Sequence, residues 1–408
     1  MNCRFCKTPV NVQFADLVNS PASNSYLTED QLNEPEIFYP LKVMVCEKCF
    51  LVQVDEYKKS SDIFNSDYAY FSSFSTSWLA HCKKYTDMMI ARFGFNQNSL
   101  VTEIASNDGY LLQYFKEQNV PVLGIEPTAN TAAVAIKKGI PSVVDFFGVR
   151  LATQLAKEGK KTDLLLGNNV LAHVPDINDF VGGMKILLKD NGVITMEFPH
   201  LYQLVLNNQF DTIYHEHFSY LSFTTVSQIF EANDLVMFDV EEVTTHGGSL
   251  RIFAKHKNDA SKPIGENVAK MFAKEKEAGM LAIDYYKNFQ LKIENIKNEL
   301  LEFLLQQKRS HKKVAAYGAA AKGNTLLNYC GIKNDMISFV VDANPAKQNK
   351  FMPASHIPIV LEERIKKDKP DFIIILPWNI KDEIVKQLDY VKEWGCKFVV
   401  PIPSLQII

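Results

Sequence analysis

Four side chains that can exchange protons stand next to one another in the middle of the chain: Tyr214, His215, Glu216 and His217. A phenol, two imidazoles and a carboxylate in a row cannot all face one hydrophobic core, so we expect some of them to line a cavity. Histidine and glutamate are frequent general acids and bases. The segment is therefore the first candidate for catalysis, and the competing interpretation is that one of the histidines only packs.

A second candidate site lies further upstream, where acidic residues follow apolar runs. Residues 103–109 read Glu-Ile-Ala-Ser-Asn-Asp-Gly, and Glu126 ends the next apolar run. A carboxylate that closes the second strand of a βαβ unit can accept both ribose hydroxyls, and Gly109 would let the backbone approach a ligand. Because positions 105 and 107 are not glycine, the pattern favours S-adenosylmethionine (SAM), which has no pyrophosphate, over NAD. The candidate cofactor-binding residues are Glu103, Ala105, Asn107, Gly109, Glu126, Pro127, Asp145, Phe146, Asn168 and Asn169.

Two cysteine pairs near the N-terminus have the spacing of zinc ligands. Cys3 and Cys6 form one Cys-x-x-Cys pair, and Cys46 and Cys49 form the other. Four thiolates give a closed tetrahedral zinc site with no open position for catalysis. The separation of the pairs is long for a zinc ribbon, and redox-active pairs share the local spacing. We predict a structural zinc that stabilises a small module. The other cysteines, expected to pack, are Cys82, Cys330 and Cys396.

Size and charge exclude several classes of protein. A chain of 408 residues is too long for a single core and predicts two or three domains. A net charge of −3 argues against a broad nucleic-acid or anionic-membrane surface. No signal peptide or run of about 18 apolar residues occurs, so we expect a cytoplasmic protein. An odd number of cysteines, seven, does not fit a secreted disulfide framework.

The elements that would position these residues alternate between strand and helix. A helix is expected over 75–93, followed by strands that begin near residues 100, 122, 142, 163 and 193. This alternation predicts an α/β fold with a doubly wound sheet whose ligands lie at the carboxyl ends of the strands. Asp145, Asn168, His173 and Glu197 fall at such ends. The alternative for Asp145 is a helix cap, and the alternative for His173 is a packed histidine. A long helical pattern over 267–308 leads into the last part of the chain.

The C-terminal part repeats the strand-and-turn pattern. Small residues at 318–321 and Lys322 follow a strand near residue 314, so backbone amides and an ammonium group could meet a phosphate. Asp342 ends the next strand, as a ribose-binding carboxylate would, which makes a dehydrogenase an alternative. The turn lacks three regularly spaced glycines. A purely structural turn is the other alternative.

Together the cysteine pairs, residues 103–109, residues 169–175 (Asn-Val-Leu-Ala-His-Val-Pro) and residues 214–218 (Tyr-His-Glu-His-Phe) resemble the sugar C-methyltransferases of deoxysugar biosynthesis. The resemblance covers essentially the whole chain. It implies a zinc-binding module at 1–75, a class I SAM-dependent methyltransferase domain at 76–260 and a C-terminal Rossmann-like domain at 261–408 that binds a nucleotide sugar. It also implies methylation at C-3 of a 4-keto-6-deoxysugar that is linked to a nucleotide, with dTDP as the expected nucleotide.

The resemblance assigns roles to particular residues. His217 would remove the C-3 proton, Tyr214 or His173 would hydrogen-bond the developing oxyanion, and Glu216 would bind the sugar or orient a partner; His215 is the likelier structural histidine. Tyr70 joins the catalytic candidates, although spacing does not choose between it and Tyr68. The candidate substrate-binding residues are Tyr68, Ser72, Ser73, His246, Arg251, Ala321, Lys322, Asn324, Asp342, Lys347 and His356.

Other functional classes stay open at this point. A SAM-dependent O-methyltransferase could use the same motifs on a hydroxyl group. A dehydrogenase would bind nicotinamide in the C-terminal part. A noncatalytic scaffold protein built around the zinc module would turn over neither SAM nor a sugar. We expect no nucleic-acid or membrane partner. The oligomeric state is open, with a monomer plausible.

Overall fold

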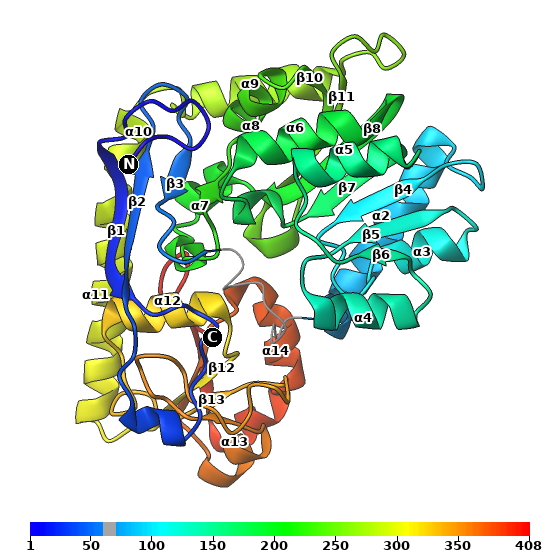
Figure 1. Cartoon of the computed structure of the whole chain (residues 1–408). Helices are drawn as coiled ribbons and strands as arrows, with labels where there is room; N and C mark the ends of the chain where they lie inside the picture. The colour runs from blue at the N-terminus through cyan, green and yellow to red at the C-terminus, as the bar shows by residue number, and fades with distance from the viewer. Residues whose placement is uncertain (60–70) are drawn as a thin grey trace.

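The computed structural model describes residues 1–59 and 71–408, which form the three β-sheets seen in Figure 1. Two of the sequence candidates, Tyr68 and Tyr70, lie outside the described residues.

The first sheet joins the N-terminal module to the middle of the chain. Its order is β1-β2-β3-β9 and its pairings are antiparallel. The last of these strands comes from the segment directly after the Tyr-His-Glu-His motif, so sheet pairing holds that motif against the N-terminal module. Residues 21–38, which we call the excursion, leave this sheet between its first two strands and contain the short helix η1. The bounds are β1 Val12–Ser20, η1 Asp30–Asn33, β2 Tyr39–Val45, β3 Val52–Val54 and β9 Ser219–Tyr220.

The second sheet is the doubly wound sheet that the sequence predicts. Its order is β10-β11-β8-β7-β4-β5-β6, with parallel pairing from β8 to β6 and an antiparallel β11 inserted between β10 and β8. This is the arrangement of class I SAM-dependent methyltransferases. The strands are β4 Val101–Ile104, β5 Val122–Ile125, β6 Ser142–Val143, β7 Thr162–Asn168, β8 Leu188–Pro199, β10 Leu235–Val243 and β11 Ser249–His256.

Helices cover both faces of this sheet and carry site residues at their ends. In the first long helix, Ser75 accepts a hydrogen bond from the Trp78 amide and Gly94 ends the helix in a left-handed conformation, as caps of these types do. The helices are η2 Ser72–Phe74, α2 Thr76–Phe93, α3 Leu112–Glu117, α4 Ala129–Lys137, α5 Val149–Lys157, η3 Leu171–His173, α6 Ile177–Leu187, α7 Leu201–Leu206, η4 Phe210–Thr212, α8 Phe223–Glu231 and η5 Thr245–Gly247.

The third sheet forms the C-terminal part, with the order β14-β13-β12-β15-β16-β17. Its strands are parallel except for the last pair. The bounds are β12 Val314–Tyr317, α12 Ala321–Cys330, β13 Val340–Val341, β14 Ile359–Val360, α13 Glu363–Asp368, β15 Phe372–Ile375, η6 Trp378–Ile380, α14 Lys381–Gln387, η7 Asp389–Trp394, β16 Lys397–Val400 and β17 Gln406–Ile407.

The helical pattern over 267–308 forms three helices instead of one. They are α9 Glu266–Glu277, α10 Asp284–Lys287 and α11 Phe289–Arg309. Gly279, with a φ of +88°, lies between the first two of them. Apolar spacing continues across this break, which is why the pattern alone suggests one helix.

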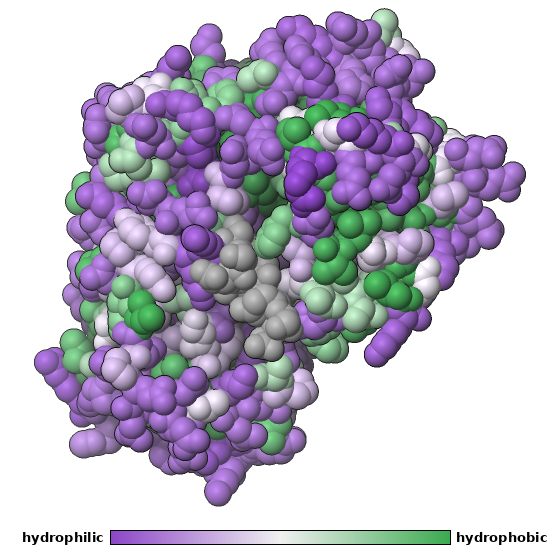
Figure 2. Space-filling model, viewed as in Figure 1, coloured by the Kyte–Doolittle hydropathy of each residue, from purple (hydrophilic) through white to green (hydrophobic). Residues whose placement is uncertain are grey.

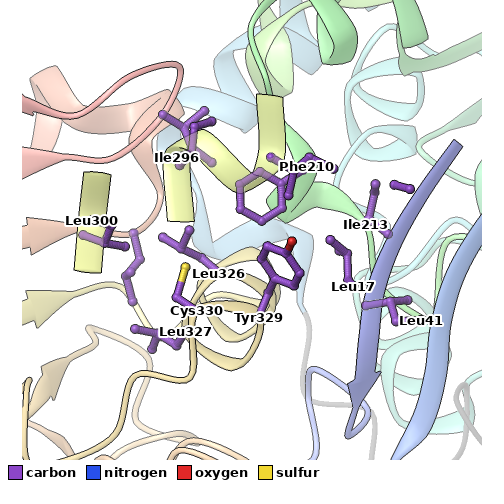
Figure 3. Close-up of a cluster of buried hydrophobic side chains, with 14 of the residues drawn as sticks. Leu17, Leu41, Phe210, Ile213, Ile296, Leu300, Leu326, Leu327, Tyr329 and Cys330 are labelled. Carbon is purple, nitrogen blue, oxygen red and sulfur yellow. The ribbon is translucent and has the colours of Figure 1, made fainter. Parts of the chain in front are cut away.

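One hydrophobic cluster joins all three parts of the chain. Figure 3 shows Leu17 and Leu41 of the N-terminal strands near Ile213, next to side chains of α11 and α12. The same cluster includes Phe210, which is fully buried. Because this core crosses the predicted limits at residues 75 and 260, those limits stay predictions.

The visible surface is mostly polar. Hydrophilic residues cover most of the face in Figure 2, and hydrophobic ones gather on its right half beside the centre. Every helix within the described residues is too short or too polar to cross a membrane.

Candidate active site and zinc site

A cavity of about 950 Å³ lies among the three sheets. Its wall includes the excursion, the start of α2, the carboxyl ends of β4, β5 and β7, the segment 212–217 and the start of α12. A pocket bounded by all three parts of the chain can hold two ligands side by side.

Many of the residues predicted from the sequence meet in this cavity. They are His173, Tyr214, Glu216 and His217 from the catalytic set; Ala105, Asn107, Glu126, Pro127, Asp145, Phe146, Asn168 and Asn169 from the cofactor set; and Ser72, His246, Ala321, Lys322 and Lys347 from the substrate set. The described candidates that do not line it are Glu103, Gly109, Ser73, Arg251, Asn324, Asp342 and His356.

His217 is oriented by the backbone of its own segment. The carbonyl oxygen of Thr212 lies 2.9 Å from Nδ1 of His217 and can accept the Nδ1 proton. That bond leaves the lone pair on Nε2, which is the form a general base needs. The rings of Tyr214 and His173 lie with centroids 4.0 Å and 4.7 Å from the His217 ring.

Burial keeps these imidazoles neutral. It lowers the pKa of His217 well below the usual value for histidine, and the neighbouring His173 lowers it further. Burial also lowers the pKa of His173 to about 4. A neutral His217 can take up a proton. A neutral His173 has a single N–H, and its ring hydrogen-bonds the Glu216 backbone.

The two middle residues of the motif face different surroundings. The amide Nδ2 of Asn24, in the excursion, donates to Oε1 of Glu216 at 2.7 Å. Burial raises the pKa of Glu216, and the Asn24 bond opposes that rise. His215 has Nε2 3.1 Å from the Pro40 carbonyl and its ring against Tyr39. It also borders the cavity, so its packing role stays a prediction.

The loop after β4 adopts glycine-like backbone angles without three glycines. Ala105, Asn107 and Gly109 all have positive φ, at +57°, +48° and +77°. A Cβ atom on Gly109 would lie 2.4 Å from Cδ1 of Ile140, so this glycine permits close packing of the loop and does not approach the cavity. Gly109 is not among the residues that border the cavity, and the expectation that it brings backbone to a ligand stays a prediction beside this packing role.

Glu126 is the buried carboxylate at the end of β5. Its Oε2 accepts the Asn107 amide at 2.9 Å, and its Oε1 accepts the Thr128 amide at 2.8 Å. Burial raises its pKa, and the Thr128 hydrogen bonds oppose the rise. Its place at the end of the second parallel strand, on the cavity wall, fits a ribose-binding carboxylate. Glu103 lies beneath this loop, and burial raises its pKa well above the usual value while Tyr110 hydrogen-bonds it.

Further cofactor candidates line the same end of the sheet. Asp145 accepts the Phe146 amide at 2.8 Å and pairs with Arg150 at 2.6 Å. Asn169, left-handed at φ +55°, lies with Nδ2 3.1 Å from Nε2 of His246. A loop that is polar at Asp145 and aromatic at Phe146 suits an adenine ring, which needs stacking and hydrogen bonds together.

Lys322 is positioned by neighbours from two other elements. Its Nζ donates to Oδ1 of Asn379 at 2.6 Å and lies 4.5 Å from the centre of the Trp378 ring. The indole nitrogen of Trp378 donates to Oδ2 of the fully buried Asp211 at 2.7 Å. Burial raises the pKa of Asp211 to about 6, while the Lys322 charge opposes that rise. An ammonium held this way at the cavity wall can meet an anion.

Most of the substrate candidates outside the cavity make contacts within the protein. Lys138 donates to Ser73 at 2.9 Å, and Glu36 lies 2.6 Å from His356. Asn324 donates to the Ser23 carbonyl, and Asp342 lies 3.6 Å from Lys347.

Arg251 is part of a buried ionic network. Its guanidinium lies 2.8 Å from Glu197, which His81 also contacts at 2.9 Å, and 3.1 Å from Glu241. Glu197 in addition accepts the Thr245 hydroxyl at 2.8 Å. The network joins α2, β8 and the loop that carries His246, so Arg251 shapes the cavity from behind instead of lining it.

Several residues of the cavity wall were missed from the sequence. They include Asn24 and Tyr26 in the excursion, Lys58 after β3 and Trp78 in α2. Trp78 stacks on His81 and lies 5.4 Å from His246, measured between ring centres. The apolar spacing of α2 places Trp78 only on a buried face, and nothing in the sequence around Asn24 predicts a contact 192 positions away.

The four N-terminal cysteines converge as zinc ligands would. All four Sγ atoms lie within 4.8 Å of one another, with Cys3–Cys49 and Cys6–Cys46 each at 3.5 Å. That distance is far too long for a disulfide and close to the separation of about 3.8 Å across a tetrahedral zinc with Zn–S bonds of about 2.3 Å.

The two cysteine pairs share one turn geometry. The residues that follow the pairs, Lys7 and Phe50, have φ of +61° and +60°, and their amides donate to the carbonyls of Cys3 and Cys46. Matching turns present two sulfurs each, so the residues fit a closed structural zinc site.

Comparison with known proteins matches the chain in three segments. Residues 3–64 match the family model "Putative zinc binding domain", residues 81–240 match "Methyltransferase domain", and residues 244–403 match "C-methyltransferase C-terminal domain". The C-methyltransferase NovU of Streptomyces niveus is 32% identical over 406 residues, which cover 100% of this chain and 96% of NovU.

Solved structures resemble part of the chain. A magnesium protoporphyrin IX methyltransferase from Synechocystis, with bound SAM, is 13% identical and aligns over 45% of this chain and 81% of its own, with a TM-score of 0.34. A protein from Pyrococcus horikoshii is 14% identical and aligns over 49% of this chain and 100% of its own, with a TM-score of 0.39.

Proposed function

Because the chain belongs to the C-methyltransferase family, with SAM as methyl donor and a structural zinc, we propose that its acceptor is a nucleotide-linked 4-keto-6-deoxysugar methylated at C-3. The observation that carries this proposal is the geometry of His217. Its Nδ1 is committed to the Thr212 carbonyl, and its ring lines the cavity that Glu126 and Asn107 also border. A base beside a donor site is what carbon methylation requires.

The acceptor carbon must first become nucleophilic. A proton on carbon beside a ketone has a pKa of roughly 20, so the enolate needs stabilisation while the proton leaves. We assign proton removal to Nε2 of His217. We assign the hydrogen bond to the C-4 oxygen to Tyr214 or His173, whose ring centres lie 4.0 Å and 4.7 Å from that of His217.

Carbon–carbon bond formation then follows from proximity. SAM supplies a methyl group on a sulfonium, which is electrophilic without further activation. The C-3 electron pair forms the new bond to that methyl, the sulfur–methyl bond breaks, and the C-3 proton remains on His217 until solvent removes it. Holding acceptor and donor in one pocket supplies much of the rate.

We place the nucleotide end of the acceptor toward the C-terminal part. Lys322 and Lys347 both border the cavity there, next to the small residues Ala320 and Ala321. Two ammonium groups beside the start of α12 suit the diphosphate of a dTDP-linked sugar.

A Lys322→Ala substitution tests the diphosphate placement. The Michaelis constant for the acceptor should rise by about tenfold, because a charged hydrogen bond to phosphate is worth about 1.5–3 kcal/mol, and the affinity for SAM should stay unchanged. Steady-state kinetics and calorimetric titration with SAM measure the two quantities. Weakened SAM binding with an unchanged acceptor constant would contradict the placement.

Methylation of a hydroxyl is the alternative function. Family membership favours carbon, and methylation of a hydroxyl forms no enolate oxyanion that a hydrogen-bond donor beside the base would stabilise. Carbon NMR of the product separates the two, since a C-methyl and an O-methyl resonance are far apart. The absence of nucleic-acid partners and the cytoplasmic location stay predictions.

Incubation with SAM and a panel of nucleotide-linked sugars tests the acceptor class. The panel should pair each 4-keto-6-deoxysugar with the matching sugar that carries a 4-hydroxyl. We expect a gain of one methyl mass only with the keto members. Methylation of the 4-hydroxyl members, or of neither set while SAM binding is intact, would overturn the proposed acceptor.

A further inference from the structure

The excursion reaches across to the C-terminal part and forms one wall of the cavity. Leu27 exchanges two backbone hydrogen bonds with Phe351, at 3.0 Å and 2.8 Å. The Tyr26 hydroxyl donates to the Ala319 carbonyl at 2.6 Å. Two further contacts, Asn324 to Ser23 and Glu36 to His356, join the same two parts. The excursion belongs to the N-terminal zinc module, yet these contacts hold it against the C-terminal part, where we place the nucleotide of the acceptor.

Asn24 lies on the cavity side of the excursion. Its Nδ2 donates to Oε1 of Glu216, while Oδ1 lies 3.3 Å from the Tyr26 hydroxyl. Both Asn24 and Glu216 border the cavity. Because an ionised carboxylate can only accept hydrogen bonds, the Asn24 amide group is oriented with its N–H toward Glu216.

The hydrogen bond from Asn24 determines which carboxylate oxygen of Glu216 can bind the acceptor. With Oε1 engaged by Asn24, the oxygen left for a bound ligand is Oε2. We propose that Asn24 is a positioning residue that fixes the Glu216 carboxylate, so that Glu216 binds a hydroxyl or amino group of the acceptor sugar next to the carbon methylated. This inference rests on the proposed acceptor class and adds a residue that acts through Glu216.

The charged and titratable groups around Glu216 come from three other segments. Lys58 follows β3, Tyr26 belongs to the excursion, and His173 lies in η3 against the Glu216 backbone. Burial favours the protonated form of Glu216, and the Asn24 amide favours the ionised form. Loss of the amide should therefore raise the pKa of Glu216.

Two substitutions at position 24, Asn24→Ala and Asn24→Asp, separate positioning from general damage. Asn24→Ala should lower kcat/KM for the acceptor by about tenfold or more, because a hydrogen bond to a charged group is lost, and should leave the dissociation constant for SAM within about twofold. Gln31→Ala, in the same excursion but off this cavity, is the matched control and should behave as wild type.

The activity of Asn24→Asp and that of Asn24→Ala should depend differently on pH. In Asn24→Asp, two carboxyls at hydrogen-bond distance can share one proton, so activity relative to wild type should rise as pH falls from 8 to 6. In Asn24→Ala, the raised pKa of Glu216 removes the ionised form, so relative activity should hold or fall over the same range. A structural defect would give both variants the same slope.

A second measurement needs no acceptor. Carbon-13 NMR of labelled glutamate carboxyls, with Glu216→Gln to assign the resonance, should show a higher pKa for Glu216 in Asn24→Ala. An unchanged Glu216 pKa, acceptor kinetics within twofold of wild type, or equal pH slopes would overturn the inference. If the wild-type protein methylated no keto sugar, the proposed function would fail, and the Glu216 titration would still decide the role of Asn24.

Discussion

At the scale of single residues, the proposed base is oriented by a backbone contact. The Thr212 carbonyl fixes the tautomer of His217, and this carbonyl comes from the same short segment as His217. Fixing the unprotonated nitrogen by a bond to the other nitrogen is a general device for histidine. The motif was visible in the sequence, but the tautomer was not, because it depends on a turn that side-chain types alone do not specify.

The protonation state of His217 gives a prediction at this scale. Burial lowers its pKa well below the usual value of about 6.5, so the neutral base persists at pH values where an exposed histidine is charged. We therefore expect that protonation of His217 does not lower kcat/KM for the acceptor between pH 8 and about 6. Initial rates in constant-ionic-strength buffers measure the profile. A fall in rate with an apparent pKa near 6.5 would show that His217 is exposed to solvent or is not the base.

Other residues of the site could be found only in three dimensions. Glu126 was predictable because the end of a parallel strand has a fixed place in such a sheet. The left-handed angle of Ala105 was not predictable, because alanine usually avoids this region. Asparagine adopts it more readily, but a single Asn107 does not identify the turn. Asn24 had no local signal at all.

At the scale of elements, the helix α2 and the short buried strands were predicted well, whereas β8 begins at Leu188, before the expected position near residue 193. The parallel strands β4, β5 and β7 begin within two residues of the expected positions, since buried strands are short apolar runs. The pattern over 267–308 was predicted as one helix, which is wrong. Gly279 breaks the helix, while the apolar residues on either side of it still face the protein.

The helix that precedes this break makes a contact that can be tested. Glu275 of α9 is fully buried and accepts hydrogen bonds from the Phe223 and Thr224 amides at the start of α8, at 2.6 Å and 2.8 Å. It also pairs with the buried His200 at 2.7 Å. It therefore caps one helix from another.

We expect Glu275→Ala to lower the free energy of unfolding by about 3 kcal/mol, because several buried donors lose their acceptor. Urea titration followed by circular dichroism measures the change. Glu277→Ala, at an exposed position in the same helix, is the control and should change the stability by less than about 0.5 kcal/mol. Equal effects of the two substitutions would contradict the capping role.

At the scale of the whole molecule, the three parts share both their core and their cavity. The N-terminal strands pack against α11 and α12, and β3 pairs with β9 directly after the catalytic motif. The sequence indicates three modules by their motifs, but it gives no sign that they are interlocked, because such packing joins residues far apart in the chain.

This interlocking predicts that the zinc site matters beyond its own module. Cys46→Ser should abolish the binding of about one zinc per chain and lower the unfolding midpoint by about 5 °C or more. It should also raise the Michaelis constant for the acceptor, since the excursion leaves the same sheet. Elemental analysis, thermal unfolding and kinetics measure the three effects, with Cys396→Ser as a control that keeps its zinc. Full zinc occupancy in Cys46→Ser would refute the four-cysteine site.

The most direct test of the account follows the C-3 proton itself. A 4-keto-6-deoxysugar nucleotide deuterated at C-3 is incubated with SAM and either the wild-type protein or His217→Asn, and the loss of deuterium and the gain of a methyl group are followed by mass spectrometry. We predict that wild type loses the deuterium and gains a methyl on C-3, and that both rates fall by about 10²–10⁴-fold in the variant, with SAM affinity retained. Deuterium loss at the wild-type rate in His217→Asn would contradict the assignment of His217 as the base.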